Sequence, residues 1–406
     1  MNDEFLELKE EIYSRLDIGT EISDEQLYAV VDECIFEKSR SRVIAISKRE
    51  KLRARLFNAI KKLDILQELL EDDDITEIMI NGCNDIFVEK NGRITRCDIV
   101  FESRERLTEV AQKIAAMSNR IVNEARPIVD TRLEDGSRVN IVLPPAAIDG
   151  PVITIRKFYD EPLTIEKLIS INSISKEAAE FLKKAVEAKY NIFISGGTGS
   201  GKTTFLNALS NFIPKDERVI TIEDSAELQI KGVNNLVRLE ARNANAQGEN
   251  EITIRDLIKS SLRMRPDRII VGEVRGAEAI DMLQAMNTGH DGSLSTGHSN
   301  STADMLSRLE TMVLMGMQLP LDAIRKQIGS AIDIIVQLGR LRDKTRKVLE
   351  ITEVYTDENG LVRLSQLYKF CEAEESKDGK VRGFLKKQNC ELYNQSKMYN
   401  AGIKEW

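Results

Sequence analysis

Short apolar runs alternate with periodically apolar stretches through the second half of the chain. Between about residues 172 and 355, apolar and largely β-branched runs lie at 191–195, 219–223, 236–239, 268–272, 293–297 and 332–338. The intervening segments carry apolar residues at helical spacing, and they include 277–286 and 304–315. This alternation predicts a mainly parallel sheet with helices on both faces. We therefore expect an α/β fold for residues 172–355.

The pattern is different in the first part of the chain. Residues 1–66 are rich in charge and place their apolar residues at helical spacing, with a capping-box sequence at 23–26. Residues 67–157 contain short strand-like runs, glycine-containing turns and one amphipathic stretch at 107–117. The sequence therefore predicts a helical N-terminal extension followed by a small α/β domain with antiparallel strands.

The remaining segments are interpreted as connections and periphery. Residues 158–171 are predicted to be a linker. A turn sequence at 357–360 predicts a hairpin, so residues 356–406 are expected to form a C-terminal hairpin and a peripheral polar tail. The basic stretch at 48–62 is interpreted as a solvated helix face, with binding to anionic lipid or nucleic acid as the alternative.

A glycine-rich segment joins one predicted strand to the next predicted helix. It consists of Gly196, Gly197, Thr198, Gly199, Ser200, Gly201, Lys202 and Thr203, followed by Thr204. The order strand, glycine-rich loop, helix is the context that a phosphate-binding loop requires, which disfavours a chance glycine-rich turn. Glycines let backbone N–H groups point at an oligophosphate, and the helix N-terminus adds partial positive charge. Lys202 would then reach the β- and γ-phosphates, and Thr203 would offer its hydroxyl to Mg²⁺.

Two of the predicted strands end in carboxylates. Glu223 and Asp224 close one strand, and Glu273 follows another, with Gly272 where a Walker B segment usually has Asp. The carboxyl ends of strands in an open α/β sheet face the ligand crevice. Glu223 is therefore a candidate to orient or deprotonate an attacking water, with an exposed acidic pair as the alternative. Glu273 is a candidate to hold Mg²⁺, to position the water, or to do both.

The chain has two histidines, His290 and His298, and both lie in one glycine-flanked segment. Core packing is a poor explanation for that placement. A zinc site would need further ligands at metal spacing, so no zinc is expected. Donation of an imidazole N–H to a phosphate, or sensing of its presence, fits better. Both histidines are therefore candidates for nucleotide contact.

Arginines form a further group of candidates. A bidentate cation on the γ-phosphate favours phosphoryl transfer, whereas a solvated charge is the alternative for each arginine. The candidates in the predicted small domain are Arg132, Arg138 and Arg156. Those around the second acidic strand are Arg263, Arg265, Arg268 and Arg275.

Composition narrows the class of protein. The chain has 406 residues, of which 42% are hydrophobic and 31% charged, as in a soluble protein of two or three domains. No run approaches the ~18 apolar residues of a membrane span, and the acidic N-terminus lacks a signal-peptide pattern. The formal net charge of −8 argues against a general nucleic-acid binder. Five scattered cysteines without a CxxC pair predict reduced thiols.

These motifs together resemble those of the type II/type IV secretion ATPases. The chain is most similar to CpaF-like assembly ATPases of Tad (Flp) pili, and next to VirB11 ATPases. The segments that carry the resemblance are 135–140, 196–203, 222–224, 262–268, 272–276 and 288–298. In that family, the loop is called Walker A, and the three later chemical segments Asp box, Walker B and His box. Two features depart from the family pattern: Gly297 replaces a bulkier apolar residue, and the tetracysteine element of many type II ATPases is absent.

The resemblance implies a RecA-like P-loop core, a PAS-like α/β domain and a ring-shaped homo-hexamer. It implies that ATP binds between the two domains, with Glu223 and Glu273 as catalytic carboxylates that also serve the metal beside Thr203. His298 would act in catalysis, with His290 and Arg275 as further nucleotide contacts. The phosphate-contacting arginines of the small domain are expected to be Arg138 and Arg156, with Arg132 as a further contact.

The predicted function is a ring-forming, Mg²⁺-dependent ATP hydrolase that powers Tad/type IV pilus assembly or type II/IV secretion through domain motion. We expect it in the cytoplasm, on the inner face of the cell membrane, with an inner-membrane platform protein as partner and no nucleic acid. The main alternative is a DNA-translocating conjugation or uptake ATPase of the VirB11 kind; the acidic balance and the lack of a basic, aromatic groove argue against it. A nucleotide-switched scaffold and a small-molecule kinase are further alternatives. Both glutamates stay candidates for the general base.

Overall fold

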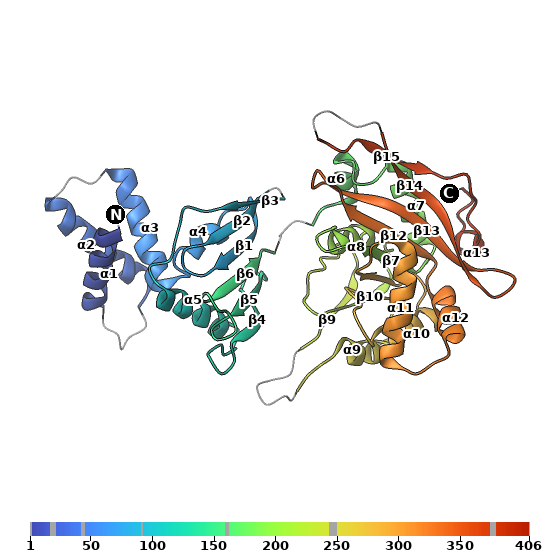
Figure 1. Ribbon diagram of the computed structural model, residues 1–406, viewed down its shortest axis with the longest axis horizontal. Coiled ribbons are helices and arrows are strands. Elements are labelled where there is room, and N and C mark those ends of the chain that lie inside the picture. Colours follow the sequence, from blue (N-terminus) through green and yellow to red (C-terminus); the bar gives the residue numbers. More distant parts are fainter. Residues whose placement is uncertain are drawn as a thin grey trace. The chain divides into compact units, whose positions relative to one another are not determined.

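The protein is described by a computed structural model over residues 2–16, 22–41, 45–90, 92–158, 162–242, 250–373 and 379–405. The chain forms two compact units, Met1–Tyr159 and Asp160–Trp406 (Figure 1). Within the described residues, no helix combines the length and apolar character needed to cross a lipid bilayer.

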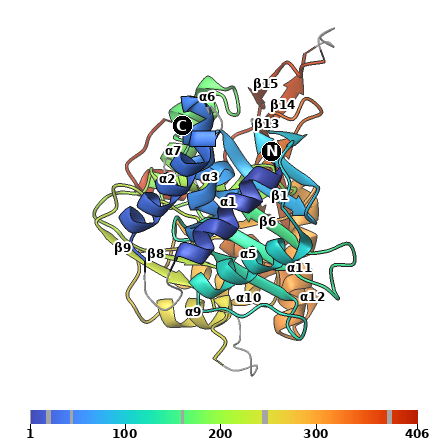
Figure 2. The ribbon, with the colours of Figure 1, turned by 90° about the vertical axis from the view of Figure 1, so that its left-hand side faces the viewer.

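Three helices open the first unit, and both views show them side by side (Figures 1 and 2). They are α1 (Asn2–Arg15), α2 (Asp24–Ser41) and α3 (Ile46–Lys61), and they share a small apolar core. The predicted capping box is confirmed: the Gln26 N–H donates to Ser23 Oγ at 3.2 Å, and the Ser23 N–H donates to Gln26 Oε1 at 3.0 Å.

Two arginines of the basic stretch of α3 contact the other helices of this bundle. The Arg53 Nε donates to Asp32 at 2.7 Å, and its guanidinium lies 4.1 Å from the Tyr28 ring centroid. The Arg55 guanidinium lies 4.4 Å from the Phe5 ring centroid. These contacts give Arg53 and Arg55 a role in packing and local charge pairing, whereas Lys48, Lys51 and Lys62 are exposed.

The rest of the first unit is a small antiparallel sheet with a helix on one face. The strand order is β3-β2-β1-β6-β5-β4, and every neighbouring pair is antiparallel. Alternate strand residues are buried against α5, whose N-cap Ser103 accepts from the Arg106 N–H at 3.1 Å. Asn91, in the predicted turn between β2 and β3, lies outside the described residues. The elements are α4 (Leu66–Leu70), β1 (Ile75–Asn81), β2 (Ile86–Lys90), β3 (Arg93–Arg96), α5 (Arg104–Met117), β4 (Ile128–Arg132), β5 (Arg138–Val142) and β6 (Val152–Arg156).

The second unit is built on a nine-stranded sheet in the order β15-β14-β13-β12-β7-β11-β10-β8-β9. The six strands from β12 to β9 are parallel, which confirms the predicted parallel sheet, and the remaining three extend it in antiparallel fashion. The strands are β7 (Ile192–Gly196), β8 (Arg218–Glu223), β9 (Asn235–Glu240), β10 (Arg268–Val271), β11 (Leu294–Gly297), β12 (Ile334–Arg340), β13 (Arg346–Thr356), β14 (Val362–Glu372) and β15 (Gly383–Lys387).

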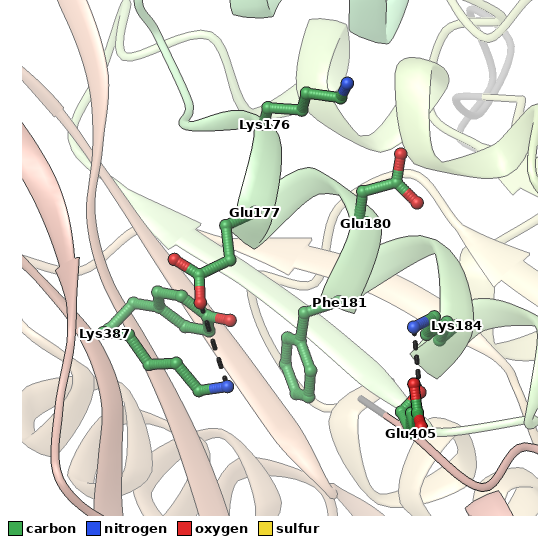
Figure 3. Close-up of a pocket in the computed structure, with 8 residues that line it drawn as sticks. Lys176, Glu177, Glu180, Phe181, Lys184, Lys387 and Glu405 are labelled. Atoms are coloured by element: carbon green, nitrogen blue, oxygen red, sulfur yellow. Dashed lines mark hydrogen bonds and ion pairs between the residues drawn. The ribbon is translucent and has the colours of Figure 1, made fainter.

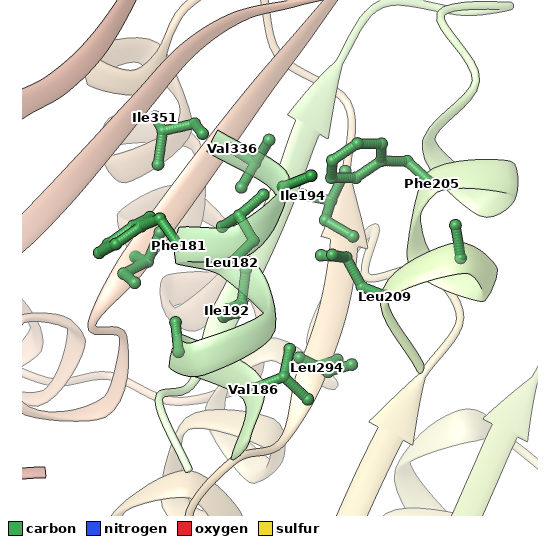
Figure 4. Close-up of a cluster of buried hydrophobic side chains, with 14 of the residues drawn as sticks. Phe181, Leu182, Val186, Ile192, Ile194, Phe205, Leu209, Leu294, Val336 and Ile351 are labelled. Carbon is green, nitrogen blue, oxygen red and sulfur yellow. The ribbon is translucent and has the colours of Figure 1, made fainter. Parts of the chain in front are cut away.

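Helices cover both faces of this sheet, as predicted. Successive residues of β7 point to opposite sides, so Ile192 and Ile194 join one apolar core while Phe193 joins the other. Figure 4 shows the first core, where α7 and α8 pack on the strands. The helices are α6 (Ile165–Ser170), α7 (Lys176–Glu187) and α8 (Lys202–Ser210) on that face, and α9 (Ile254–Ser261), α10 (Ala279–Asn287), α11 (Thr302–Gly316) and α12 (Leu321–Ala331) on the other.

The predicted linker is shorter than expected. Its residues 159–161 lie outside the described residues, but Thr164 caps α6 by accepting from the Lys167 N–H at 3.3 Å. Ile165 and Leu168 of this helix are buried in the core of the second unit. The six-residue helix therefore belongs to the packed unit.

The expectation of a peripheral C-terminal tail is wrong for its described part. Leu392 and Met398 are buried in the core beside β7, although polar residues surround them in the sequence. Lys397, in α13 (Ser396–Asn400), contacts Asp291 at 2.7 Å and Asp333 at 2.8 Å. Isolated apolar residues give no periodic signal, and this is why the sequence pattern missed the packing. Residues 374–378 and 406 of the expected tail lie outside the described residues.

Candidate active site

Five parallel strands of the second unit end at one edge of the sheet, and the candidate residues follow them. In the register, Ser195 of β7 lies opposite both Gln337 of β12 and Gly297 of β11. Val271 of β10 lies opposite Ile222 of β8 and Ser295 of β11. The segments that leave these strands therefore emerge side by side. This topology brings the glycine-rich loop, both glutamates and His298 to the same edge.

The glycine-rich loop has a backbone that requires its glycines. Gly199 and Gly201 have φ angles of 69° and 93°, in the left-handed region that side chains disfavour. At Gly196, a Cβ would lie 2.6 Å from Ser200 Oγ and 2.7 Å from the Leu338 carbonyl oxygen. Helix α8 begins directly after the loop, at Lys202. The structure therefore places residues 196–201 as a loop and residues 202–204 as the first turn of the helix that follows, the arrangement that binds phosphate.

Lys202, His298 and Glu273 meet beside this loop. The Lys202 Nζ donates to the Gly197 carbonyl at 3.2 Å and lies 3.3 Å from His298 Nδ1. The His298 Nε2 lies 2.9 Å from Glu273 Oε1. The Lys202 Nζ also lies 3.4 Å from His298 Nε2, and the Glu273 Oε1 has no hydrogen-bond partner among the described residues. The three groups are therefore in close contact, but no hydrogen bond joins His298 to Glu273. On the far side, the Arg275 Nη2 donates to Glu273 Oε2 at 2.8 Å.

Local hydrogen bonds fix the segments that carry this cluster. The Thr296 Oγ1 donates to the Gly272 carbonyl at 2.8 Å, which ties the residue before Glu273 to β11. Past His298, Ser301 caps α11 by accepting from the Asp304 N–H at 3.1 Å. Hydrogen bonds close to Glu273 and His298 therefore hold the backbone that carries these two side chains.

The charges in this cluster set its protonation. Burial acts to raise the pKa of Glu273, but the hydrogen bond and charge of Arg275, with His298 and Lys202, lower it overall. Burial and the Lys202 ammonium lower the pKa of His298 below its usual range, and they outweigh the opposing effect of Glu273. At neutral pH the cluster is therefore a cation, a neutral imidazole and a carboxylate in a row.

Glu223 lies deeper in the same edge and has a different environment. Its side chain is 3% exposed, and Oε2 accepts from the Glu227 and Leu228 N–H groups at 2.8 Å and 2.9 Å. Burial raises the pKa of Glu223 to about 7. A Cβ at Gly272 would lie 2.9 Å from Glu223 Cγ. An aspartate at residue 272 would therefore collide with Glu223, which explains the departure from the Walker B pattern.

The Glu223→Gln substitution is expected to stabilise the fold at high pH. The folded-state pKa of Glu223 is above its ordinary value of 4.5, so burying its charge costs stability above pH 7, and that cost disappears below about pH 4.5. Since one pKa unit corresponds to about 1.4 kcal/mol, we expect a gain of roughly 1–3 kcal/mol in the free energy of unfolding at pH 8 and little gain at pH 4.5. Urea unfolding at both pH values measures this. Glu187→Gln, at an exposed carboxylate, is the control, and an equal gain at both pH values would contradict the raised pKa.

Buried polar atoms at this edge are unsatisfied within the described part of the chain. They include the Ser200 Oγ and the Glu223 Oε1. Buried polar atoms in folded proteins normally have a hydrogen-bond partner. Their position beside the loop is what a site for a polar ligand requires.

The structure does not bring every candidate to this edge. His290 precedes β11 whereas His298 follows it, so the strand places the two histidines at opposite edges of the sheet. The His290 Nδ1 lies 3.2 Å from the Ala285 carbonyl oxygen, near the end of α10. The expected nucleotide contact of His290 is therefore not supported within this unit.

Arg268 also lies away from the candidate active site, at the other end of its strand. It is fully buried at the amino end of β10. Its Nη2 donates to Glu217 Oε1 at 3.1 Å, and its Nη1 donates to the Val186 carbonyl at 2.7 Å. Arg268 therefore ties strands to α7 and is not a phosphate contact.

The three arginines of the first unit form a row on its sheet. Arg132, Arg138 and Arg156 are direct register partners on β4, β5 and β6, and Glu77 of β1 continues the row beside Arg156. Neighbouring Cβ atoms in such a row are about 5 Å apart, and like charges directly opposite one another are unfavourable. The row concentrates positive charge on the face opposite α5, as a site for an anion would.

Sequence reasoning missed one contact to the loop. The Arg346 Nε, at the start of β13, donates to the Gly199 carbonyl at 2.8 Å. Arg346 is 147 residues from Gly199 in the chain, and only the position of β12 beside β7 brings it there. The arginines that flank the hairpin at 341–345 were the feature of the sequence that could have indicated this contact.

A separate groove lies along the outer side of α7 (Figure 3). Its volume is about 460 Å³, and residues from α7, β14, β15 and the chain end line it. The charges on its wall contact one another, with the Lys387 Nζ 3.8 Å from Glu177 and the Lys184 Nζ donating to the Glu405 carbonyl at 2.8 Å. None of the candidates above lines this groove, so it is not part of the candidate active site.

A family model, curated proteins and solved structures all match this chain, and the sequence matches below are to secretion or conjugal transfer proteins. A family model described as "Type II/IV secretion system protein" matches residues 59–398. The putative conjugal transfer protein Rv3659c of Mycobacterium tuberculosis is 35% identical over 293 residues, which cover 71% of this chain and 83% of that protein. The type IV secretion system protein VirB11 of Brucella suis is 33% identical over 325 residues, covering 73% and 90%. The solved ATPase DotB of Legionella pneumophila has a TM-score of 0.52 at 22% identity, covering 72% and 80%, and this likeness supports the α/β fold alone.

Proposed function

Because the chain belongs to the type II/IV secretion system protein family, we propose that its second unit hydrolyses ATP to drive a secretion or conjugal transfer machine. The chain is an NTP hydrolase of the secretion ATPase kind. The observation that carries the proposed chemistry is the contact of Lys202, His298 and Glu273 beside the glycine-rich loop, with His298 2.9 Å from Glu273 and 3.3 Å from Lys202.

The loop and Lys202 would hold the triphosphate. Backbone N–H groups of residues 197–203 would cradle the phosphates, and the start of α8 would add partial positive charge. Lys202 is 7% exposed, so its ammonium is largely desolvated and would act strongly on the β- and γ-phosphates. Thr204, in the first turn of α8, would contact the same phosphates.

Mg²⁺ fits the donors at this edge. Among the described residues, no cluster of three or more histidine, cysteine, aspartate or glutamate side chains could hold a metal by itself. Mg²⁺ instead binds ATP-dependent enzymes through one or two carboxylates, phosphate oxygens and waters. The Thr203 hydroxyl, Glu273 and the unsatisfied Oε1 of Glu223 would supply the protein ligands or hold the bound waters. When bound, the ion would neutralise charge that develops on the phosphates.

Glu223 and Glu273 would have different roles in hydrolysis. Glu223 has a pKa near 7 and one carboxylate oxygen without a partner among the described residues, so it suits acceptance of a proton from the attacking water. Glu273 is ionised and contacts His298 and Arg275, so it would orient the water and report the phosphate state to both. Neutral His298 carries a single N–H, which would donate to the γ-phosphate when ATP is bound.

The arginine row of the first unit would supply a second set of phosphate contacts. Arg138 and Arg156 are register partners on adjacent strands, and Arg132 extends the row. We propose a homo-hexamer in the cytoplasm, at the inner face of the membrane, with an inner-membrane platform protein as partner.

The relatives favour conjugal transfer or type IV secretion over pilus assembly. Those reported above are named as a conjugal transfer protein and a VirB11 protein, so the specific resemblance to CpaF-like Tad ATPases is not supported. This chain is therefore proposed to power a transfer machine of the VirB11 kind. Its net charge of −8 argues that other components contact DNA.

A complementation experiment tests this role. The gene is deleted in its own host, and the wild-type or Lys202→Ala chain is restored. We expect wild-type but not variant protein to restore transfer of a mobilisable plasmid to recipient cells, with no change in surface filaments. Loss of filaments with plasmid transfer intact would instead favour pilus assembly and contradict the proposed role.

A further inference from the structure

The hairpin between β12 and β13 lies against the outside of the glycine-rich loop. Arg340 ends β12 and Arg346 begins β13, and the two are register partners. The Arg346 Nε donates to the Gly199 carbonyl at 2.8 Å, and a Cβ at Gly201 would lie 3.5 Å from Arg346 Cδ. A Cβ at Gly199 would lie 3.8 Å from Arg340 Nη1. Both arginine side chains therefore lie along this loop.

A hydrogen-bond donor from outside the loop stabilises a glycine-rich loop of this kind. When its N–H groups point inward at a phosphate, its carbonyls point outward and need partners of their own. Glycine loses more conformational freedom on ordering than any other residue, so this loop is costly to fix. Arg346 holds the carbonyl of Gly199, one of the two left-handed glycines, through a charged donor. The contact therefore stabilises this carbonyl and the loop conformation around it.

The backbone of the same hairpin is joined to the turn between α6 and α7. The Ser173 Oγ donates to the Arg346 carbonyl at 2.7 Å, and the Val348 N–H donates to the Ser173 carbonyl at 2.8 Å. The Lys347 Nζ donates to the Asn172 carbonyl at 2.7 Å. This turn closely follows α6, the first helix of the second unit.

We propose that Arg346 is a positioning residue for ATP hydrolysis, which shapes the glycine-rich loop and couples it to the α6–α7 turn. The proposal rests on the proposed function, because the loop must bind nucleotide. One residue makes both links, since its side chain holds Gly199 and its carbonyl accepts from Ser173. A change in the loop on nucleotide binding would reach α6 through a single strand end. Helix α6 directly precedes this turn in the chain, so it is the element that a change at the turn would reach first.

The first test measures how strongly the glycine-rich loop binds MgATP. Arg346→Ala should weaken MgATP binding by about 3- to 10-fold, the effect of losing one hydrogen bond of ordinary net strength, because this bond is exposed to solvent. Arg346→Lys should recover part of that affinity, because it keeps a donor but loses the planar guanidinium. Arg342→Ala is the matched control, since this arginine of the same hairpin pairs with Glu372 at 2.9 Å. Equal affinity in Arg346→Ala and Arg342→Ala, with thermal unfolding unchanged, would overturn the positioning role.

The second test measures the coupling by hydrogen exchange on the full chain. In the wild-type protein, saturating MgADP should slow exchange both in residues 197–210 and in residues 165–175. In Arg346→Ala at saturating MgADP, protection of 197–210 should persist while that of 165–175 is lost. Retained protection of 165–175 in this variant would overturn the coupling. If the wild-type chain shows no protection of 197–210, the proposed function fails instead.

Discussion

Replacing Lys202 with Ala should abolish ATP turnover, with a loss of about 10³-fold or more in kcat. The Lys202 ammonium is largely buried, lies 3.3 Å from His298 and contacts the loop carbonyl of Gly197. In the proposed reaction it neutralises charge on the β- and γ-phosphates, and alanine leaves the developing phosphate charge without this cation. Steady-state phosphate release at saturating MgATP measures the loss.

The matched control for this substitution is Lys183→Ala. Lys183 is an exposed lysine of α7 whose Nζ lies 4.0 Å from Glu187, and the substitution removes the same charge. It should keep turnover within about twofold, because exposed ion pairs contribute little. A Lys202→Ala protein that hydrolyses ATP at the wild-type rate would show that the loop does not perform the chemistry.

The Glu273→Gln substitution should lower kcat by about 10²- to 10³-fold while leaving nucleotide bound. Glutamine keeps the shape of the side chain but removes the charge that faces His298 Nε2 at 2.9 Å and Arg275 at 2.8 Å. The lost interaction is needed mainly during the reaction, so kcat should fall more than KM changes.

The control for Glu273→Gln is Glu310→Gln. Glu310 accepts from the Arg325 Nε at 2.9 Å on the helical face of α11 and α12, and losing this exposed pair should leave kcat within about twofold. A Glu273→Gln protein with normal kcat and weakened binding would indicate a role in ground-state binding alone, contrary to the proposed one.

The centre of the second unit was predictable because its signals are local. A β-branched run, a glycine-rich loop and an amphipathic helix are contiguous in the sequence, and the structure has them as β7, residues 196–201 and α8. The parallel sheet followed from the same alternation of patterns. Glu223 and Glu273 were selected as strand-end carboxylates, and register places the ends of their strands side by side.

The predictions that failed, and the contact that was missed, share one physical cause. Each depends on how separate segments of the chain pack together. His290 and His298 are eight positions apart, but a strand runs between them and separates them across the sheet. The described part of the polar C-terminal segment packs on the core through isolated residues such as Met398. Arg346 reaches Gly199 only because β12 lies beside β7. Periodicity within one segment carries no information on any of these pairings.

The most direct test of the central claim is phosphate release in a single turnover, with the full chain in excess over radiolabelled MgATP. Wild-type protein should release phosphate, whereas Lys202→Ala and Glu273→Gln should release almost none over the same time at concentrations where Glu273→Gln still binds ATP. Release at wild-type rates by both variants, or bound ATP that the wild-type chain leaves intact, would contradict an active site at the carboxyl edge of this sheet.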